Sequence, residues 1–391
     1  MKYTNLFFAI TLLSFSVKTF SQVEPVRPIT TAVPFLLIAG DARSSGLGDM
    51  GVATPVDAFS QQWNPAKYAF TENKSGIGLA YTPYLRELVT DINLGQLTYY
   101  NRINDRSAFA GSIRFFGLGG VELRETIDQV PREVEPNEFA ADLSYALRLS
   151  EEFSMAVTGR YIRSDQRIPG AGGDATAANS FSSDISAFYR GEEKFYNNFN
   201  GRWRFGGAIQ NIGPKNKFDD AGQENFLPTN LKLGAGFDFI LDQSNKIGVY
   251  TEFNKLLVPT PPALERDDSG NFTPESQQAI LDYRNGDSFS GIFNSFSDAP
   301  DGFSEELKEV IWALGAEYWY EDSFAFRLGY FNEAAEKGFR QFVTLGAGFR
   351  YTSIYIDASY LFSTTPVQNP LEGTLRFSIT FNIGDGTYIE Y

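Results

Sequence analysis

Hydrophobic and polar residues alternate with a period of two in segment after segment of this chain. The clearest segment places large apolar side chains on one face and polar ones on the other: Leu375, Phe377, Ile379 and Phe381 against Arg376, Ser378 and Thr380. Because successive side chains of a β-strand point to opposite faces, such a segment predicts a strand with one apolar and one polar face. This pattern is typical of a membrane β-barrel with lipid outside and a polar interior. The alternative is a soluble sandwich, in which the apolar face meets a second sheet.

Fourteen segments carry this pattern closely enough to predict strands. A strand of ten residues is about 33 Å long, which, when tilted, crosses the apolar band of an outer membrane. The predicted strands cover residues 76–81, 91–101, 107–116, 138–149, 153–163, 181–189, 202–212, 230–240, 246–254, 310–319, 324–331, 342–350, 354–362 and 374–382.

The lengths of the connections also alternate. Short links follow most even-numbered strands, as at 102–106 and 150–152, with 190–201 as the exception, whereas long links such as 117–137 and 256–309 follow odd-numbered strands. Membrane barrels have short periplasmic turns, longer outer loops and an even number of strands, so that both termini are expected in the periplasm. A sandwich has no reason to sort its loops in this way. We therefore predict an all-β membrane protein, a fourteen-stranded antiparallel outer-membrane β-barrel over residues 76–382, with 383–391 as a periplasmic tail.

The amino terminus carries the features of an export signal. Lys2 precedes an apolar run at 6–17, and small residues occupy the two positions that precede signal cleavage, Thr19 and Ser21. We expect a secretory signal peptide over residues 1–21. Its removal takes away two of the 33 basic residues and leaves 31 against 48 acidic ones, a net charge of −17. This acidity argues against nucleic acid as a partner, because phosphate binding needs a basic surface.

The chain contains neither Cys nor His. Disulfides, thiol nucleophiles, His-ligated metal sites and Ser-His-Asp triads are therefore excluded. An outer-membrane enzyme acting on lipid would need a nucleophile with a base such as His. We expect no catalytic residue, no metal ligand and no cofactor. No segment reaches 18 consecutive apolar residues, so no transmembrane helix is expected either.

Residues 22–75 precede the first strand and have no apolar core of their own. They are expected to fold into the lumen as a plug, or hatch, with Asp41 and Arg43 paired with lumenal charges such as Arg114, Arg160, Arg204 or Glu252. Its Gly-x-Gly follows no strand of a βαβ unit, which argues against a dinucleotide-binding loop. The residues predicted to form the plug are Asp41, Arg43, Gly46, Gly48, Trp63, Asn64 and Pro65.

The connection 256–309 is too long to be a simple link. Thr273 and Pro274 predict the start of one helix, and Ser304 predicts another. The segment contains eleven acidic and three basic residues, a net charge of −8. Exposed aromatic residues suit partner recognition, although they could equally pack on the barrel mouth as a lid. The candidates for a partner-binding surface are Phe289, Phe293, Phe296 and Phe303.

Three stretches of the chain resemble a known family. They are Phe35-Leu-Leu-Ile-Ala-Gly-Asp-Ala-Arg43 with Gly46 and Gly48 after it, Trp63-Asn-Pro-Ala66, and Glu252-Phe-Asn-Lys-Leu-Leu-Val-Pro-Thr-Pro-Pro262. This pattern resembles the PorV family, the outer-membrane shuttle proteins of the type IX secretion system in Bacteroidetes, over essentially the whole mature chain. The Asn-Pro-Ala element also resembles the hatch of the wider FadL-like family of fourteen-stranded barrels.

The resemblance implies a non-enzymatic role in protein secretion. PorV-like proteins bind the carboxy-terminal signal domain of cargo leaving a SprA-type translocon. They pass it to an attachment complex that contains a PorU-type sortase with PorQ and PorZ. The implied location is the bacterial outer membrane, in contact with lipid bilayer and lipopolysaccharide. The competing hypothesis is a FadL-like transporter of hydrophobic small molecules, which would need an apolar route that lumenal faces rich in Arg, Asp, Glu and Ser do not suggest.

Overall fold

The computed structural model describes residues 26–385 apart from 87–88, 125–127, 129, 167–176, 218–223 and 366–369. The predicted signal peptide, residues 1–21, and residues 386–391 of the predicted tail lie outside the described residues. No helix in the described part of the chain is long and apolar enough to cross a membrane.

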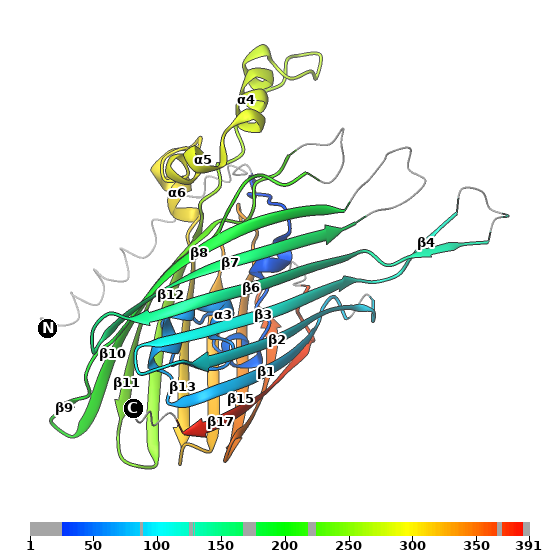
Figure 1. The fold of residues 1–391 in the computed structure, drawn as a ribbon. Helices are drawn as coiled ribbons and strands as arrows, with labels where there is room; N and C mark the ends of the chain where they lie inside the picture. Colours follow the sequence, from blue (N-terminus) through cyan, green and yellow to red (C-terminus); the bar gives the residue numbers. More distant parts are fainter. Residues whose placement is uncertain are drawn as a thin grey trace, which may run out of the picture.

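Fourteen antiparallel strands of the described chain close into a barrel (Figure 1). Pairing of β17 with β1 and of β10 with β11 completes the ring. Around the wall the strands are β1 (Asn73–Pro83), β2 (Ile92–Arg102), β3 (Ser107–Leu118), β6 (Asn137–Arg148), β7 (Phe153–Asp165), β8 (Ala178–Arg190), β10 (Phe199–Ile212), β11 (Asn230–Ile240), β12 (Asn245–Leu256), β13 (Ile311–Tyr320), β14 (Phe324–Asn332), β15 (Gln341–Tyr351), β16 (Ile354–Ser363) and β17 (Leu375–Asp385).

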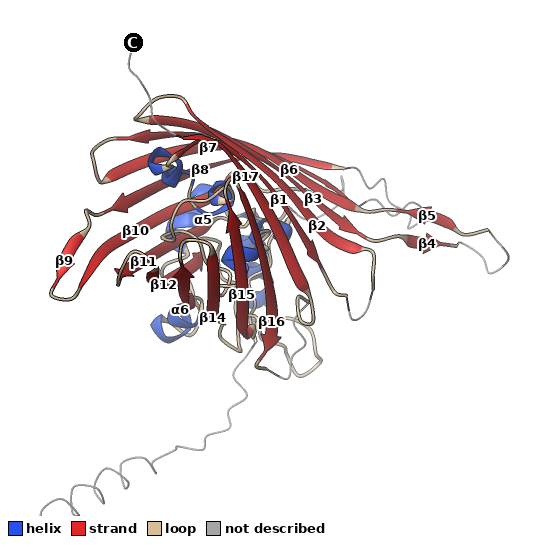
Figure 2. Cartoon of the chain, turned by 90° about the horizontal axis from the view of Figure 1, so that it is seen from below, coloured by secondary structure: helices blue, strands red, loops and turns tan. Residues whose placement is uncertain are grey.

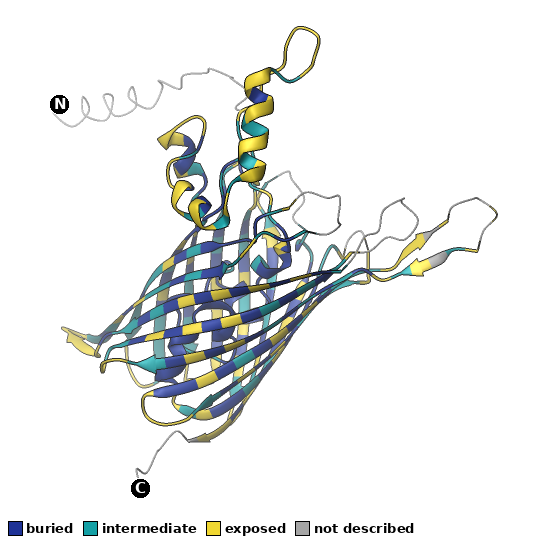
Figure 3. Cartoon of the chain, turned by 45° about the horizontal axis from the view of Figure 1, so that its top comes forward, coloured by how far each residue is buried: buried dark blue, intermediate teal, exposed yellow. Residues whose placement is uncertain are grey.

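The predicted barrel and its fourteen strands are confirmed, with ends that differ by a few residues. The predicted faces are confirmed too: along β17, Leu375, Phe377 and Phe381 are exposed on the outer surface, whereas Arg376 and Ser378 are buried inside. Figure 3 shows the same alternation of exposed and buried positions along neighbouring strands. The inward faces do not meet a second sheet, which removes the sandwich alternative.

Replacing Ile379 with Arg is expected to lower the stability of the barrel by about 2–4 kcal/mol, the cost of an arginine facing lipid near the bilayer midplane. Across the ladders Ile379 is opposite Leu79 and Ile356, whose side chains also face outward. The measurement is the free energy of unfolding by urea in lipid vesicles. Tyr351→Arg is the control, because Tyr351 is exposed at the end of β15, where the cost should fall to about 0–1 kcal/mol. Equal losses at the two positions would contradict the lipid-facing assignment of Ile379.

The two ends of the barrel differ. At the short-turn end, the links after β2, β6, β11, β13 and β15 are tight turns, and the link after β8 is extended by β9 (Lys194–Tyr196). At the long-loop end, a hairpin of β4 (Val121–Leu123) and β5 (Arg132–Val134) projects beyond the strands (Figure 2). The same end carries α4 (Pro274–Asn285), α5 (Ser288–Asn294) and α6 (Phe303–Lys308), which belong to the link between β12 and β13.

A segment from the amino-terminal part of the chain lies inside the ring of strands. It comprises η1 (Pro34–Leu37), α2 (Ala42–Ser45), α3 (Ser60–Trp63) and η2 (Pro65–Phe70), and we call residues 34–71 the lumenal segment. It contacts β15, β16 and β17 through α2, and β3, β6, β7 and β8 through η2. Three clusters of buried apolar side chains lie between this segment and the inner wall.

The chain enters the lumen from the long-loop end. Arg27 N donates to Glu336 O at 3.0 Å and Ala32 N donates to Phe226 O at 2.8 Å, and both acceptors belong to long connections. The segment then reaches the short-turn end, where β1 begins at Asn73. The expectation that both termini lie at the short-turn end is therefore wrong for the first described residues, because the lumenal segment traverses the barrel before the first strand.

Candidate functional site

The link between β12 and β13 forms a lobe beyond the long-loop end, residues 257–310 (Figure 3). The predicted start of α4 is confirmed: Thr273 caps the helix by accepting a hydrogen bond from Ser276 N, and Pro274 is its first residue. The second predicted helix is α6, which begins at Phe303, one residue before the predicted start. Between them α5 begins after Asp287, whose side chain accepts from Phe289 N and Ser290 N.

The acidic face of α6 is buried against the barrel. Lys255 Nζ, at the end of β12, lies 2.9 Å from Glu306 Oε2 and 2.6 Å from Glu309 Oε2. Lys337 Nζ, in the link between β14 and β15, lies 2.7 Å from Glu305 Oε1 and 2.8 Å from Glu309 Oε1. All five side chains are buried. Charge-assisted hydrogen bonds of this kind are among the stronger ones, so they attach the lobe firmly to the end of β12 and to the link between β14 and β15.

The first described residues join the same ion cluster. Arg27 Nε and Nη2 donate to Glu305 at 3.0 and 2.8 Å, and the guanidinium also pairs with Asp301. Burial raises the pKa of Glu305, but hydrogen bonds from Arg27 and Lys337 outweigh burial and lower this pKa to about 2. Glu305 is therefore ionised near neutral pH. Its contribution to the attachment is complete above the ordinary pKa of 4.5 and is lost only as the pH falls towards 2.

Helix α5 rests on the protein through small residues. A Cβ on Gly291 would come within 3.0 Å of Pro259 Cγ and 3.5 Å of Phe226 Cε1, so glycine permits this close approach. Ser295, directly after the helix, is fully buried. The buried side of α5 is therefore built from small side chains, and its large ones lie elsewhere.

The phenylalanines of α5 and α6, and Phe296 just after α5, face solvent. Phe289, Phe293 and Phe296 are 61%, 75% and 51% exposed, and Phe303 is 76% exposed. Leu307, one turn after Phe303, is exposed as well; sequence analysis missed it, although the i, i+4 spacing was a signal. A surface helix normally turns its apolar side inward. The exposed rings do not pack on the barrel mouth, which argues against a lid, and exposed apolar patches mark interaction sites.

The residues predicted to form the plug come together inside the barrel. Asp41 caps α2 by accepting from Ser44 N at 2.8 Å, and it accepts from Trp63 Nε1 at 2.9 Å. Asn64 Nδ2 donates to the backbone oxygens of Val52 and Ala187, each at 2.9 Å. Pro65 then begins η2. These bonds join separate parts of the lumenal segment to one another and to β8.

The partners expected for Asp41 and Arg43 are different in the structure. Arg43 forms a two-pronged pair with Glu317 of β13, with both distances 3.0 Å, and its Nη1 lies 2.9 Å from Asp57 Oδ2. Within the described chain Asp41 forms no ion pair. The expected partners are occupied by other groups: Arg114 by backbone oxygens, Arg160 by Asp142 and Asp184, Arg204 by Asp238, and Glu252 by Gly51 N, Val52 N and Lys232.

Inward-facing glycines of the wall let the lumenal segment come close, a feature that sequence analysis missed. A Cβ on Gly329 would lie 2.1 Å from Gly48 N, and one on Gly206 would lie 2.0 Å from Val52 O. Glycine in a strand can mark such a close approach, and this was the available signal. The glycines of the wall that face residues 46–53 include Gly206, Gly234, Gly315, Gly329 and Gly346.

A family model described as "Type IX secretion system protein PorV" matches residues 21–263 of the chain. The match includes the lumenal segment and the strands from β1 to β12. No curated protein matches the chain in sequence.

Solved barrel structures are similar at low sequence identity. The Pseudomonas putida toluene transporter TodX is 12% identical, with a TM-score of 0.50 over 89% of this chain and 99% of that one. The CymD monoaromatic hydrocarbon channel is 12% identical, with a TM-score of 0.49 over 90% and 99%. A FadL homologue from Pseudomonas aeruginosa is 13% identical, with a TM-score of 0.44 over 92% and 100%. At such identity the likeness to TodX shows the fold alone.

Proposed function

The chain belongs to the PorV family of type IX secretion system proteins, and from this membership we propose that it binds the carboxy-terminal signal domain of secreted cargo. It is an outer-membrane β-barrel component of that system, and its family and fold are not those of an enzyme. In the proposed cycle a SprA-type translocon releases the cargo. The protein then carries the cargo to an attachment complex with a PorU-type sortase, PorQ and PorZ.

The apolar surface of the lobe is the observation that supports this role. Phe289, Phe293 and Phe296 are exposed on the lobe, which ion pairs attach to the barrel. Aromatic side chains of this kind are enriched at protein interfaces. The lobe has a net charge of −8, of which three negative charges are matched by Arg27, Lys255 and Lys337 from outside it. The remaining acidity favours a partner whose apolar contact is flanked by basic groups.

Replacing Phe289, Phe293 and Phe296 together with Ser is expected to weaken cargo capture by about thirtyfold or more. A buried aromatic anchor contributes about 2 kcal/mol to binding, which corresponds to that factor. The measurement is the affinity of the purified protein for an isolated cargo signal domain, together with co-purification of cargo and translocon from native membranes.

The control is Phe195→Ser, because Phe195 is 75% exposed in β9 at the opposite end of the barrel. This variant should bind cargo like the unmodified protein. If the triple variant binds, co-purifies and secretes normally while its barrel assembles, the lobe is not the cargo site.

Transport of hydrophobic compounds is the outcome that would replace this proposal. The interior is crossed by buried ion pairs such as those of Arg43, Glu317 and Arg327, which an apolar solute would have to pass. Fatty-acid uptake that depends on the intact protein, with secretion unaffected by its loss, would favour the transporter.

A further inference from the structure

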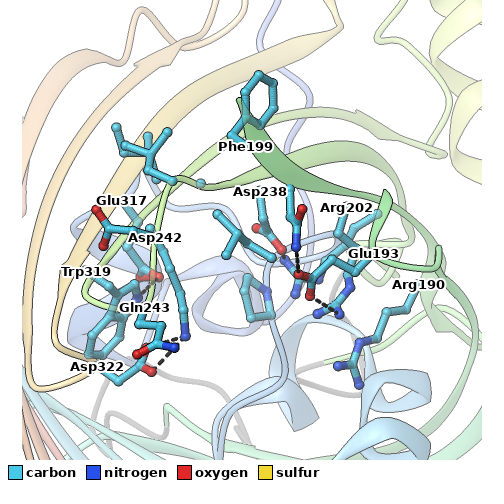
Figure 4. Close-up of a pocket in the computed structure, with 18 of the residues that line it drawn as sticks. Arg190, Glu193, Phe199, Arg202, Asp238, Asp242, Gln243, Glu317, Trp319 and Asp322 are labelled. Carbon is cyan, nitrogen blue, oxygen red and sulfur yellow. Dashed lines mark hydrogen bonds and ion pairs between the residues drawn. The ribbon is translucent and has the colours of Figure 1, made fainter. Parts of the chain in front are cut away.

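At the short-turn end the lumen opens into a pocket that lies opposite the lobe. Its volume is about 780 Å³, and residues of three separate turns or links line it, including Glu193, Asp242 and Asp322. A second cavity of about 200 Å³ adjoins it and shares much of the same lining. Figure 4 shows Arg190, Arg202 and Glu193 on one side of the pocket, and Glu317, Trp319 and Asp322 on the other.

Four arginines line both cavities: Arg190, Arg202, Arg204 and Arg350. Arg204 of β10 is directly opposite Arg190 in the ladder with β8, and Arg202 lies two residues before Arg204 on the same face. Arg350 comes from β15. Like charges directly opposite each other destabilise a sheet, so this grouping is not explained by the stability of the wall.

The carboxylates nearby do not match this group of cations fully. Arg204 pairs with half-buried Asp238, but Arg202 pairs with exposed Glu193 at 3.2 Å. Arg190 lies 3.7 Å from Glu72, whose side chain is 86% exposed.

Arg350 is held by rings instead of carboxylates. Its guanidinium carbon lies 4.7 Å from the ring centroid of Trp319 and 3.9 Å from that of Tyr355. Among the residues that the structure describes, Arg202 Nε and Arg350 Nε are buried and have no hydrogen-bond partner. A buried donor without an acceptor is unfavourable, so these two side chains keep unused hydrogen-bonding capacity beside the cavity.

Apolar side chains line the larger cavity as well as these arginines. Phe199, Ile247 and Trp319 line it together with Val56 of the lumenal segment. The pocket therefore combines charged and apolar side chains, and its volume is in the range of small-molecule sites.

We propose that this pocket binds a small amphipathic anion. Its carboxylate or phosphate group accepts hydrogen bonds from Arg202 and Arg350, and its apolar part lies against Phe199, Ile247 and Trp319. Arginine suits both acids because its planar guanidinium can donate two parallel hydrogen bonds. The site is separate from the cargo surface proposed for the lobe, since it lies at the other end of the barrel.

The test is calorimetric titration of the purified full-length protein in a non-ionic detergent. The probes are phenyl phosphate, phenylacetate, inorganic phosphate, benzyl alcohol and benzyltrimethylammonium. We expect saturable binding of phenyl phosphate and phenylacetate, with each of the other three at least tenfold weaker. Equal binding of benzyl alcohol, or no saturable binding of either aromatic anion at millimolar concentration, would overturn the proposal.

Arg202→Gln and Arg350→Gln identify the site. Each should weaken phenyl phosphate at least tenfold, about the effect of one charge-assisted hydrogen bond. Arg106→Gln removes a cation from the same end of the barrel but from outside both cavities, and it should change nothing. Unchanged binding in both pocket variants would overturn the assignment. If a variant fails to fold, as shown by its migration on unheated gels, the comparison of probes on the unmodified protein still tests whether the pocket prefers an amphipathic anion.

Discussion

Removal of residues 34–70 is expected to turn a closed barrel into an ion-conducting pore. These residues lie inside the ring and contact strands on opposite sides of it, including β6, β7, β15 and β16. Eight-stranded barrels are filled by their own side chains, whereas barrels of 16–18 strands leave an aqueous channel, and fourteen strands are close to the latter. Single-channel recording in planar bilayers should show a rise in conductance of roughly tenfold or more.

Deletion of residues 264–285, which removes α4 from the lobe, is the control for this experiment. It should leave the conductance low, because these residues lie outside the barrel. Circular dichroism has to show that both shortened proteins keep their strands, since the first deletion removes the interior core. Large conductance in the intact protein would mean that the lumenal segment does not act as a plug.

Replacing Glu317 with Ala is expected to lower the free energy of unfolding by about 3–5 kcal/mol, the usual loss when one partner of a buried ion pair is removed. Glu317 is 1% exposed and accepts from Arg43 at 3.0 Å, from Arg327 at 2.8 Å and from Trp319 Nε1 at 2.6 Å. The substitution leaves two guanidinium groups buried with fewer acceptors. The measurement is urea unfolding in lipid vesicles.

Glu151→Ala provides the comparison for Glu317→Ala. Glu151 pairs with Arg148 in the turn between β6 and β7, and its side chain is 88% exposed. An exposed pair of this kind contributes about 0–1 kcal/mol. Similar losses in the two variants would show that the pair between Glu317 and Arg43 does not hold the lumenal segment to the wall.

The strands could be predicted from the sequence because each carries its own signal. The alternation of Leu375, Phe377 and Phe381 with Arg376 and Ser378 needs no knowledge of the neighbouring strand. The start of α4 is equally local, since a Thr cap and a first-turn Pro are adjacent in the chain. The exact strand ends depend on pairing with the neighbours, and there the predictions differ by a few residues.

The interior of the barrel could not be predicted in the same way. Arg43 and Glu317 are 274 residues apart, and their meeting depends on where the lumenal segment stops along β13. The many acidic and basic residues that face the lumen indicate that ion pairs will form. They do not indicate which residues will pair with one another. The wall glycines could signal a close approach in general, but the sequence does not show that Gly48 is the group that approaches Gly329.

The path of the lumenal segment has a consequence for the biogenesis of the protein. The chain passes from the long-loop end to the short-turn end before β1 begins, and β1 closes the wall against β17, the last strand to be made. Asp49 and Ala42 of the segment also bond to Arg376 and Ser378 of β17. Insertion of the segment into a closed barrel would require its charged side chains to pass through a narrow lumen. Closure of the seam around a segment already in place avoids that barrier and makes the final step of assembly depend on residues synthesised before the first strand.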